Sequence, residues 1–259
     1  MNVHLIRGRC SFQIVALAVL ALAGLGIFAS PDSRATPALV PSPGQMPPIP
    51  NGGERYLNVN DVWHATQGLQ PGQSLDFDTQ MGDYFAIVRA PDGNAGELET
   101  FNGLLVMHLT TTGVNPPINR IIAINTTNQW DSKAPYLAPG PIRSFDVDMM
   151  GLQGQLPPGD PDFDLLRITA GSNFGLPSPG HTTLTQLSPG GNWNVDSFFD
   201  ITYRIDFVGH PGGPLGGMSG STTGTIRMQL CETIPEPSCA ILLLAGAVGA
   251  LARRTIRAA

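Results

Sequence analysis

The sequence contains a single lysine, Lys133, and only 13% of its 259 residues are charged. A phosphate-binding P-loop and a Ser-x-x-Lys nucleophile both need a lysine at a defined position, and the residue three places before Lys133 is Trp130. The scarcity of lysine therefore excludes both sites, and it excludes a Schiff-base lysine at any position other than 133.

Basic residues are also scarce in the central part of the chain. Residues 51–230 hold 17 acidic and 8 basic residues, a net charge of −9. Nucleic-acid binding needs a face of clustered Lys and Arg whose contacts release counterions from the phosphates. Eight scattered cations do not form such a face, so nucleic acid is not expected as a partner. The acidic balance is consistent with a secreted protein that binds calcium or is simply soluble.

Cysteine occurs three times, at Cys10, Cys231 and Cys239. The first and the last of these lie in or beside the apolar segments at the two ends of the sequence. We therefore expect the central part to fold without an internal disulfide. With about 180 residues it is long enough to bury a core on its own.

Glycine occurs 31 times and proline 24 times, and both residues interrupt helices. This excludes a large helical bundle. Runs typical of β-strands recur instead between Gly-, Pro- and Asn-rich turn sequences. They cover residues 84–89, 98–110, 118–125, 142–149, 163–169, 182–187, 198–208 and 222–230. We therefore predict an all-β fold, an antiparallel β-sandwich or jelly-roll-like single domain over residues 54–231, with the terminal apolar segments as helices.

The N-terminal residues carry the features of an export signal. Arg7 and Arg9 precede an apolar run at residues 14–29, and small residues follow this run. This order is typical of a secretory signal peptide, which we predict for residues 1–35. The alternative is an uncleaved anchor, but the run is shorter than the roughly 20 residues that cross a bilayer. Residues 36–53 hold six prolines and no charge, which predicts an extended linker.

The C-terminal segment, residues 232–259, has three ordered parts. A Pro-Glu-Pro motif at 235–237 is followed by an uncharged apolar stretch at 239–252 and then by arginines. The prolines keep the backbone extended, and arginines beside an apolar segment favour the cytoplasmic side of a membrane. In this order the segment closely resembles the PEP-CTERM sorting signal of Gram-negative-type bacteria.

The PEP-CTERM resemblance implies a route to the cell surface. The export machinery and a membrane-embedded exosortase would be the partners, and the protein would reach the cell surface or extracellular matrix of an exopolysaccharide-producing bacterium. The membrane would be contacted only through the terminal segments, with transient anchoring of the tail in the inner membrane. The motif residues are Pro235, Glu236, Pro237, Arg253 and Arg254. The alternative is an ordinary tail anchor, for which the apolar stretch is short. Residues 191–228 are similar to segments of other exported bacterial proteins, a resemblance that implies no activity.

Three carboxylates stand at alternate positions in Asp160, Asp162 and Asp164. Ca²⁺ binds several carboxylate oxygens, so this run is a candidate calcium site. Leu165 stands where an EF-hand has glycine, and the alternative interpretation is a solvated turn that leads into a strand. Paired carboxylates are also typical of glycosidases, but that chemistry depends on a separation in space.

Three tryptophans each have polar neighbours in the sequence: Trp63, Trp130 and Trp193. Sugar-binding modules stack pyranose rings on aromatic side chains flanked by amides and carboxylates, so these residues are candidate carbohydrate contacts. The alternative is that they belong to the core or rim of a β-sandwich.

Local nucleophile and zinc motifs are lacking. The sequence at 217–221 comes near Gly-x-Ser-x-Gly but ends in serine and lies in a glycine-rich segment. The four central histidines have no metal-ligand spacing, and we expect His108 to pack at the edge of the core. The sequence as a whole predicts an exported, non-enzymatic surface or matrix protein. The alternatives are an exopolysaccharide-binding module and a glycoside-active enzyme.

Overall fold

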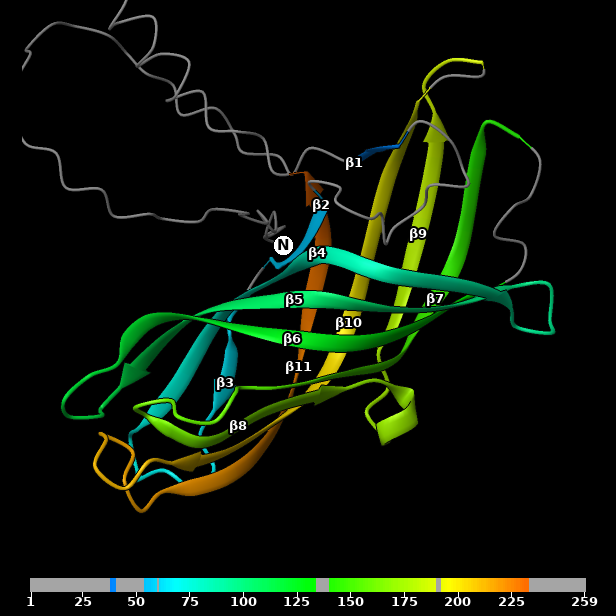
Figure 1. The fold of residues 1–259 in the computed structure, drawn as a ribbon. Coiled ribbons are helices and arrows are strands. Elements are labelled where there is room, and N and C mark those ends of the chain that lie inside the picture. The colour runs from blue at the N-terminus through cyan, green and yellow to red at the C-terminus, as the bar shows by residue number, and fades with distance from the viewer. Residues whose placement is uncertain (1–37, 41–53, 60, 134–139, 190–191, 233–259) are drawn as a thin grey trace, which may run out of the picture.

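The computed structural model describes residues 38–40, 54–59, 61–133, 140–189 and 192–232 (Figure 1). In these residues the chain forms eleven strands and one short 3₁₀-helix, and every strand pairing is antiparallel. The prediction of an all-β antiparallel fold is confirmed. The predicted terminal helices lie outside the described residues.

The elements follow one another with few long connections. They are β1 (Ala38–Val40), β2 (Glu54–Asn58), β3 (Trp63–Ala65), β4 (Ser74–Pro91), β5 (Glu97–Thr112), β6 (Asn119–Ser132), β7 (Ile142–Gln155), β8 (Phe163–Ala170), η2 (Ser172–Phe174), β9 (Pro179–Gln186), β10 (Trp193–Gly209) and β11 (Ser219–Glu232).

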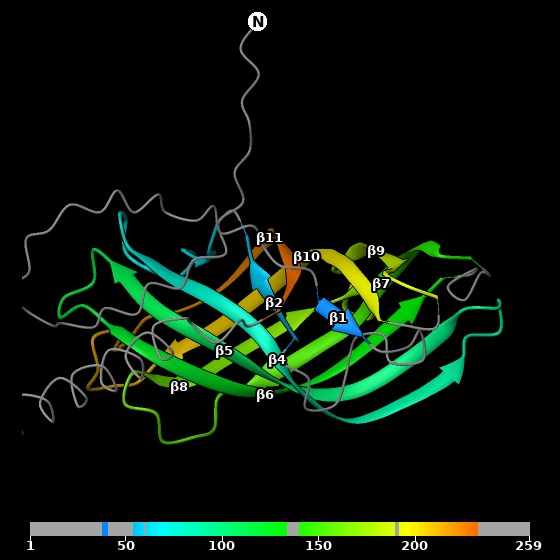
Figure 2. The same ribbon diagram turned by 90° about the horizontal axis from the view of Figure 1, so that it is seen from above.

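The strand pairing closes on itself. The sheet order runs β1-β10-β11-β2-β4-β5-β6-β7-β8, and β8 pairs with β10 as well as with β7. The short strand β3 is added to β4. In both views β4, β5 and β6 form one layer that crosses the layer of β9, β10 and β11 (Figures 1 and 2). The two layers enclose the core between them.

Strands β8 and β9 occupy one position between β7 and β10, end to end. β9 pairs with the first part of β10 (Trp193 to Ser197), and β8 pairs with its last part (Tyr203 to Gly209). The turn through η2 joins them. It begins at Gly171, which has a φ of +105° and whose Cβ, if present, would lie 2.6 Å from the Met150 carbonyl group. Only glycine fits there without displacement of β7.

The core follows the alternation of the strands. On β10, Phe199, Ile201, Tyr203, Ile205 and Phe207 are all buried, and the polar residues between them face outward. The predicted strand run at residues 198–208 lies within this alternating strand. The burial of these large apolar side chains is the main source of stability.

Each of the eight predicted strand runs overlaps a strand, but three short strands were not predicted. β1 lies within residues 36–53, the predicted linker, and its Ala38 pairs with Val195 of β10. β2 starts at Glu54, and there Glu54 lies opposite Glu232 at the end of β11. The two ends of the main domain are therefore neighbours.

His108 is not at the edge of the core. It is half-buried on the outward side of β5, where its Nε2 lies 2.7 Å from Asn119 Oδ1. The prediction was wrong because the inward residues of β5 are Leu105, Met107 and Leu109, and a period of two places His108 on the opposite face.

Candidate functional site

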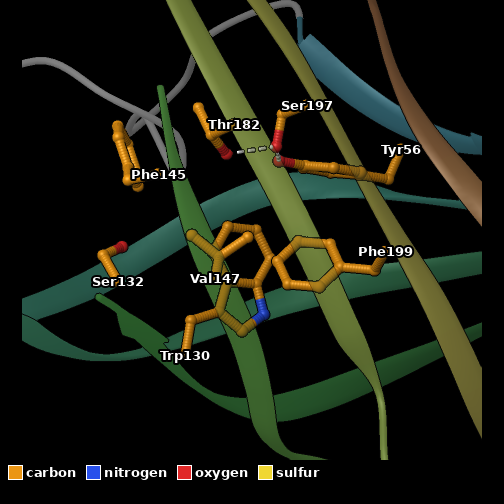
Figure 3. A pocket seen from close by; sticks show the side chains of 8 residues that line it. All are labelled: Tyr56, Trp130, Ser132, Phe145, Val147, Thr182, Ser197 and Phe199. Atoms are coloured by element: carbon orange, nitrogen blue, oxygen red, sulfur yellow. Dashed lines mark hydrogen bonds between the residues drawn. The ribbon is translucent and has the colours of Figure 1, made fainter. Parts of the chain in front are cut away.

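A small cavity lies between the two layers (Figure 3). Its lining consists of Tyr56, Trp130, Ser132, Phe145, Val147, Thr182, Ser197 and Phe199. The space open to the centre of a water molecule is about 10 Å³, which is room for one water and no larger ligand.

Three hydroxyl groups at this cavity are paired with one another, whereas the buried Trp130 Nε1 has no hydrogen-bond partner among the described residues. The Tyr56 hydroxyl donates to Ser197 Oγ at 2.8 Å, and the Ser197 and Thr182 hydroxyl oxygens are also 2.8 Å apart. This chain of hydrogen bonds joins β2, β10 and β9 inside the core. It satisfies buried polar atoms rather than offering them to a ligand.

All three tryptophans are buried, with exposures of 0% for Trp63, 2% for Trp130 and 3% for Trp193. Trp63 stacks on Tyr203 with ring centroids 4.6 Å apart. The Arg143 guanidinium lies 4.6 Å from the Trp193 ring centroid.

Trp130 is the centre of an aromatic cluster with Tyr56, Tyr84, Phe101 and Phe199. This arrangement corrects the prediction that the tryptophans contact carbohydrate. Their inward positions on the strands leave no ring face for a sugar, and they pack the core instead.

The three alternate carboxylates have basic partners. Asp160 pairs with Arg120 and accepts hydrogen bonds from the backbone N–H groups of Asp162 and Phe163 at 3.0 and 3.2 Å. Burial alone would raise the pKa of Asp160, but the hydrogen bond from Arg120 and the two N–H groups outweigh it and hold the pKa below its usual value.

Asp162 and Asp164 extend this pattern. Asp162 Oδ2 lies 2.9 Å from Arg120 Nε, and Asp164 Oδ1 lies 2.7 Å from Nδ1 of His210. Within the described ranges, no three His, Cys, Asp or Glu side chains are grouped so that they could hold a metal ion. Calcium binding by these carboxylates stays a prediction, and it would require them to exchange their basic partners for the cation.

Glu99 is a buried acid on the inward side of β5. Its side chain has no exposed area and lies opposite Trp130 of β6. Burial raises its pKa to about 8, and Arg89, whose Nε is 3.2 Å from Oε1, offsets only part of that effect. At neutral pH most molecules therefore carry a protonated Glu99.

The central histidines pair with oxygen atoms of other segments. His64 lies between two carboxylates, with Nδ1 2.7 Å from Asp76 Oδ1 and Nε2 3.2 Å from Asp61 Oδ1. Burial alone would lower the pKa of His64, but the two carboxylates outweigh it and raise the pKa.

His181 contacts both a carboxylate and a serine hydroxyl, the groups that accompany a histidine at many catalytic sites. Its Nδ1 lies 2.8 Å from Asp146 Oδ1, and its Nε2 lies 2.7 Å from Ser144 Oγ. The register places Asp146 of β7 directly opposite His181 of β9, and Ser144 opposite Thr183. A serine, a histidine and an aspartate are thus joined in a line on the outward side of the sheet.

The same outward side continues across β10 and β11. The Phe198 and His181 ring centroids are 6.5 Å apart, and the Arg227 guanidinium carbon lies 4.0 Å from the Phe198 centroid. Arg227 also donates two hydrogen bonds of 2.7 Å to Asp200. We call this surface the polar face. It consists of Ser144, Asp146, His181, Thr183, Asp196, Phe198, Asp200, Arg227 and Gln229.

Sequence reasoning did not find the polar face. Ser144 and Asp146 are two residues apart in a predicted strand, which is enough to place them on one side of a sheet. The third member, His181, comes from a strand 35 residues away from Asp146. The pairing register that brings it opposite Asp146 has no local sequence signal.

The sorting motif, Pro235 to Pro237 with Arg253 and Arg254, lies outside the described residues. In the part of the chain with described structure, no helix has the length and apolar character that a membrane crossing needs.

No family model matches the sequence. Neither the curated proteins nor the solved structures contain a match to the chain.

Proposed function

We propose that this chain is an exported bacterial protein of the cell surface or extracellular matrix, with a structural or interaction role that needs no catalytic step. The observation that carries the proposal is the order of the C-terminal segment. The Pro-Glu-Pro motif at 235–237 begins three residues after the last strand, which ends at Glu232, and the apolar stretch at 239–252 and then Arg253 with Arg254 follow it.

In this proposal each part of the tail has a physical task. The extended Pro-Glu-Pro motif is presented to an exosortase, the apolar stretch holds the chain in the inner membrane, and the arginines stay on its cytoplasmic side. Cleavage near Pro235 to Pro237 then frees the domain from the membrane. The N-terminal signal, residues 1–35, directs the chain into the export machinery.

The packing of the domain is compatible with export. Its strand pairing returns to β10, and a core cluster of buried apolar side chains fills the space between the two layers. Such a sandwich or jelly-roll-like domain would stay folded without cofactor or disulfide. Its outward surface would supply the contacts with other matrix components.

The sorting proposal is tested by replacing Pro235, Glu236 and Pro237 together with alanine. We expect the variant to remain in the membrane fraction with its tail intact, because the motif presented for cleavage is gone. Fractionation of the producing cells and mass spectrometry of the C-terminal peptide measure both effects. Replacing Pro41, Ser42 and Pro43 by alanine is the matched control and should leave processing unchanged. Normal processing of the tail variant would show that the motif is not the cleavage signal.

A second candidate role is exopolysaccharide binding, which the polar face favours. Phe198 is half-buried on the outward side of β10, between Asp196 and Asp200 in the strand, and the Arg227 guanidinium carbon lies 4.0 Å from its ring centroid. We expect the full chain to bind the exopolysaccharide of the producing cell and Phe198→Ala to weaken binding several-fold. Phe174→Ala, which removes an exposed aromatic ring on η2, is the control. Equal binding by both variants would remove the polar face from this role.

The same binding assay tests the calcium prediction. Loss of binding in a chelator, and in a variant with Asp160, Asp162 and Asp164 replaced by asparagine, would assign the cation to that loop. Binding that is unchanged by both treatments would show that calcium has no part in it.

A further inference from the structure

The contacts of His181 distinguish its two ring nitrogens. Asp146 lies on the Nδ1 side at 2.8 Å and Ser144 Oγ on the Nε2 side at 2.7 Å. A carboxylate accepts hydrogen bonds only, so it holds the proton of the neutral ring on Nδ1. Nε2 is then left with a lone pair directed at the serine hydroxyl, which is the arrangement that activates a serine as a nucleophile.

The backbone holds this arrangement firmly. β7 and β9 pair at seven consecutive positions, from Ile142↔Thr185 to Asp148↔Pro179. Asp146 and His181 are a direct cross-strand pair, and Ser144 is diagonal to His181, because it lies opposite Thr183, two residues further along β9. Reactive groups on paired strands keep their relative positions better than groups on loops.

Two neighbours indicate what could react there. The Thr183 and Ser144 hydroxyl oxygens are 3.4 Å apart, so the Thr183 hydroxyl is close enough to donate a hydrogen bond to a group bound at Ser144. Asp196 on β10, directly opposite Thr183 of β9, adds negative charge beside the site, whereas the charge of Asp200 is offset by Arg227. This charge disfavours anionic substrates.

The site is also open. Ser144 and Asp146 are exposed, and the ring of Phe198 supplies an apolar contact beside His181. A flat, exposed site fits a small uncharged acyl group that projects from a larger molecule.

We infer that Ser144, His181 and Asp146 form a hydrolytic site for small uncharged carboxylic esters, an activity that goes beyond the proposed surface role. Ser144 Oγ attacks the ester carbonyl carbon while its proton passes to His181 Nε2. The C–O bond of the ester breaks, and the alcohol leaves with that proton. Water then attacks the acyl-serine and transfers a proton to His181. The acid is released as the proton returns to Ser144.

The first test is covalent labelling. The purified full chain is treated with a fluorophosphonate, which reacts with activated serines, and the labelled peptide is identified by mass spectrometry. We expect one label per chain, on Ser144. Labelling spread over several serines, or absent from Ser144, overturns the inference, and this readout requires no variant to fold.

The second test is the burst of p-nitrophenolate from p-nitrophenyl acetate. We expect the burst to release about one equivalent of p-nitrophenolate per chain. The burst rate should fall at least ~10-fold in Ser144→Ala and in His181→Gln, and it should also fall in Asp146→Asn. His210→Gln removes a matched His–Asp pair elsewhere, and Ser172→Ala removes a hydroxyl 3.5 Å from Asp148. Both controls should keep the burst. Equal bursts in all variants would overturn the inference and leave the sorting proposal untouched, because that proposal is tested on the tail.

Discussion

The buried Glu99 makes the stability of this domain depend on pH. Its folded pKa, about 8, lies above the ordinary 4.5, so between these values the folded chain binds more protons than the unfolded chain. The contribution of Glu99 to stability is therefore complete below about pH 4.5 and is lost as the pH rises to about 8. We expect Glu99→Gln to remove this loss and to be more stable than the original chain at pH 9 by about 3 to 5 kcal/mol. Urea unfolding of both full chains from pH 4 to pH 9 measures the difference, and parallel curves would contradict it.

Residue-level function was the hardest part to predict from the sequence. The polar neighbours of Trp63 and Trp193 suggested exposure, yet the side chain of a strand residue follows the face of its own position and not its neighbours' polarity. Nothing near Asp164 in the sequence indicates that it pairs with His210, 46 residues away. Contacts across such distances depend on strand register, which local sequence does not encode.

At the scale of elements, the turn between β8 and β9 carries the sharpest prediction. At Gly171 a Cβ would lie 2.6 Å from the backbone of Met150 and Gly151, whereas at Gly175, with a φ of +70°, nothing lies within 4 Å. We expect Gly171→Ala to cost about 2 to 4 kcal/mol through clash and backbone strain, and Gly175→Ala about 1 kcal/mol through strain alone. The free energy of unfolding of the two variants in urea provides the comparison. Equal losses would mean that the turn relaxes to admit the side chain.

Elements with a clear period were predicted well. The long strands β5, β10 and β11 overlap runs of alternating residues in the sequence. β1 and β3 were missed because three residues are too few to show a period, and β3 forms only by addition to β4. The fold class was therefore accessible from the sequence, while the short additions were not.

At the scale of the whole molecule, the closure of the sheet had no counterpart in the sequence. It depends on β8 pairing with both β7 and β10, and on β2 pairing with β11 across most of the chain. The polar face is a product of that closure, because the closure brings β7, β9, β10 and β11 side by side. Only the composition and the spacing of turns predicted that a single strand-rich domain would form.

Because Glu54 lies opposite Glu232, both the start and the end of the domain lie at one end of it. We call this end, next to the C-terminal tail, the proximal pole, and the opposite end the distal pole. A tail that is fixed to a surface would hold the proximal pole toward that surface and turn the β10–β11 turn, residues 210–218, toward the surroundings. Gln229, at one border of the polar face, is three residues from Glu232. The polar face would therefore contact molecules that lie along the surface to which the tail is fixed. It would not contact molecules that approach that surface from the surrounding medium.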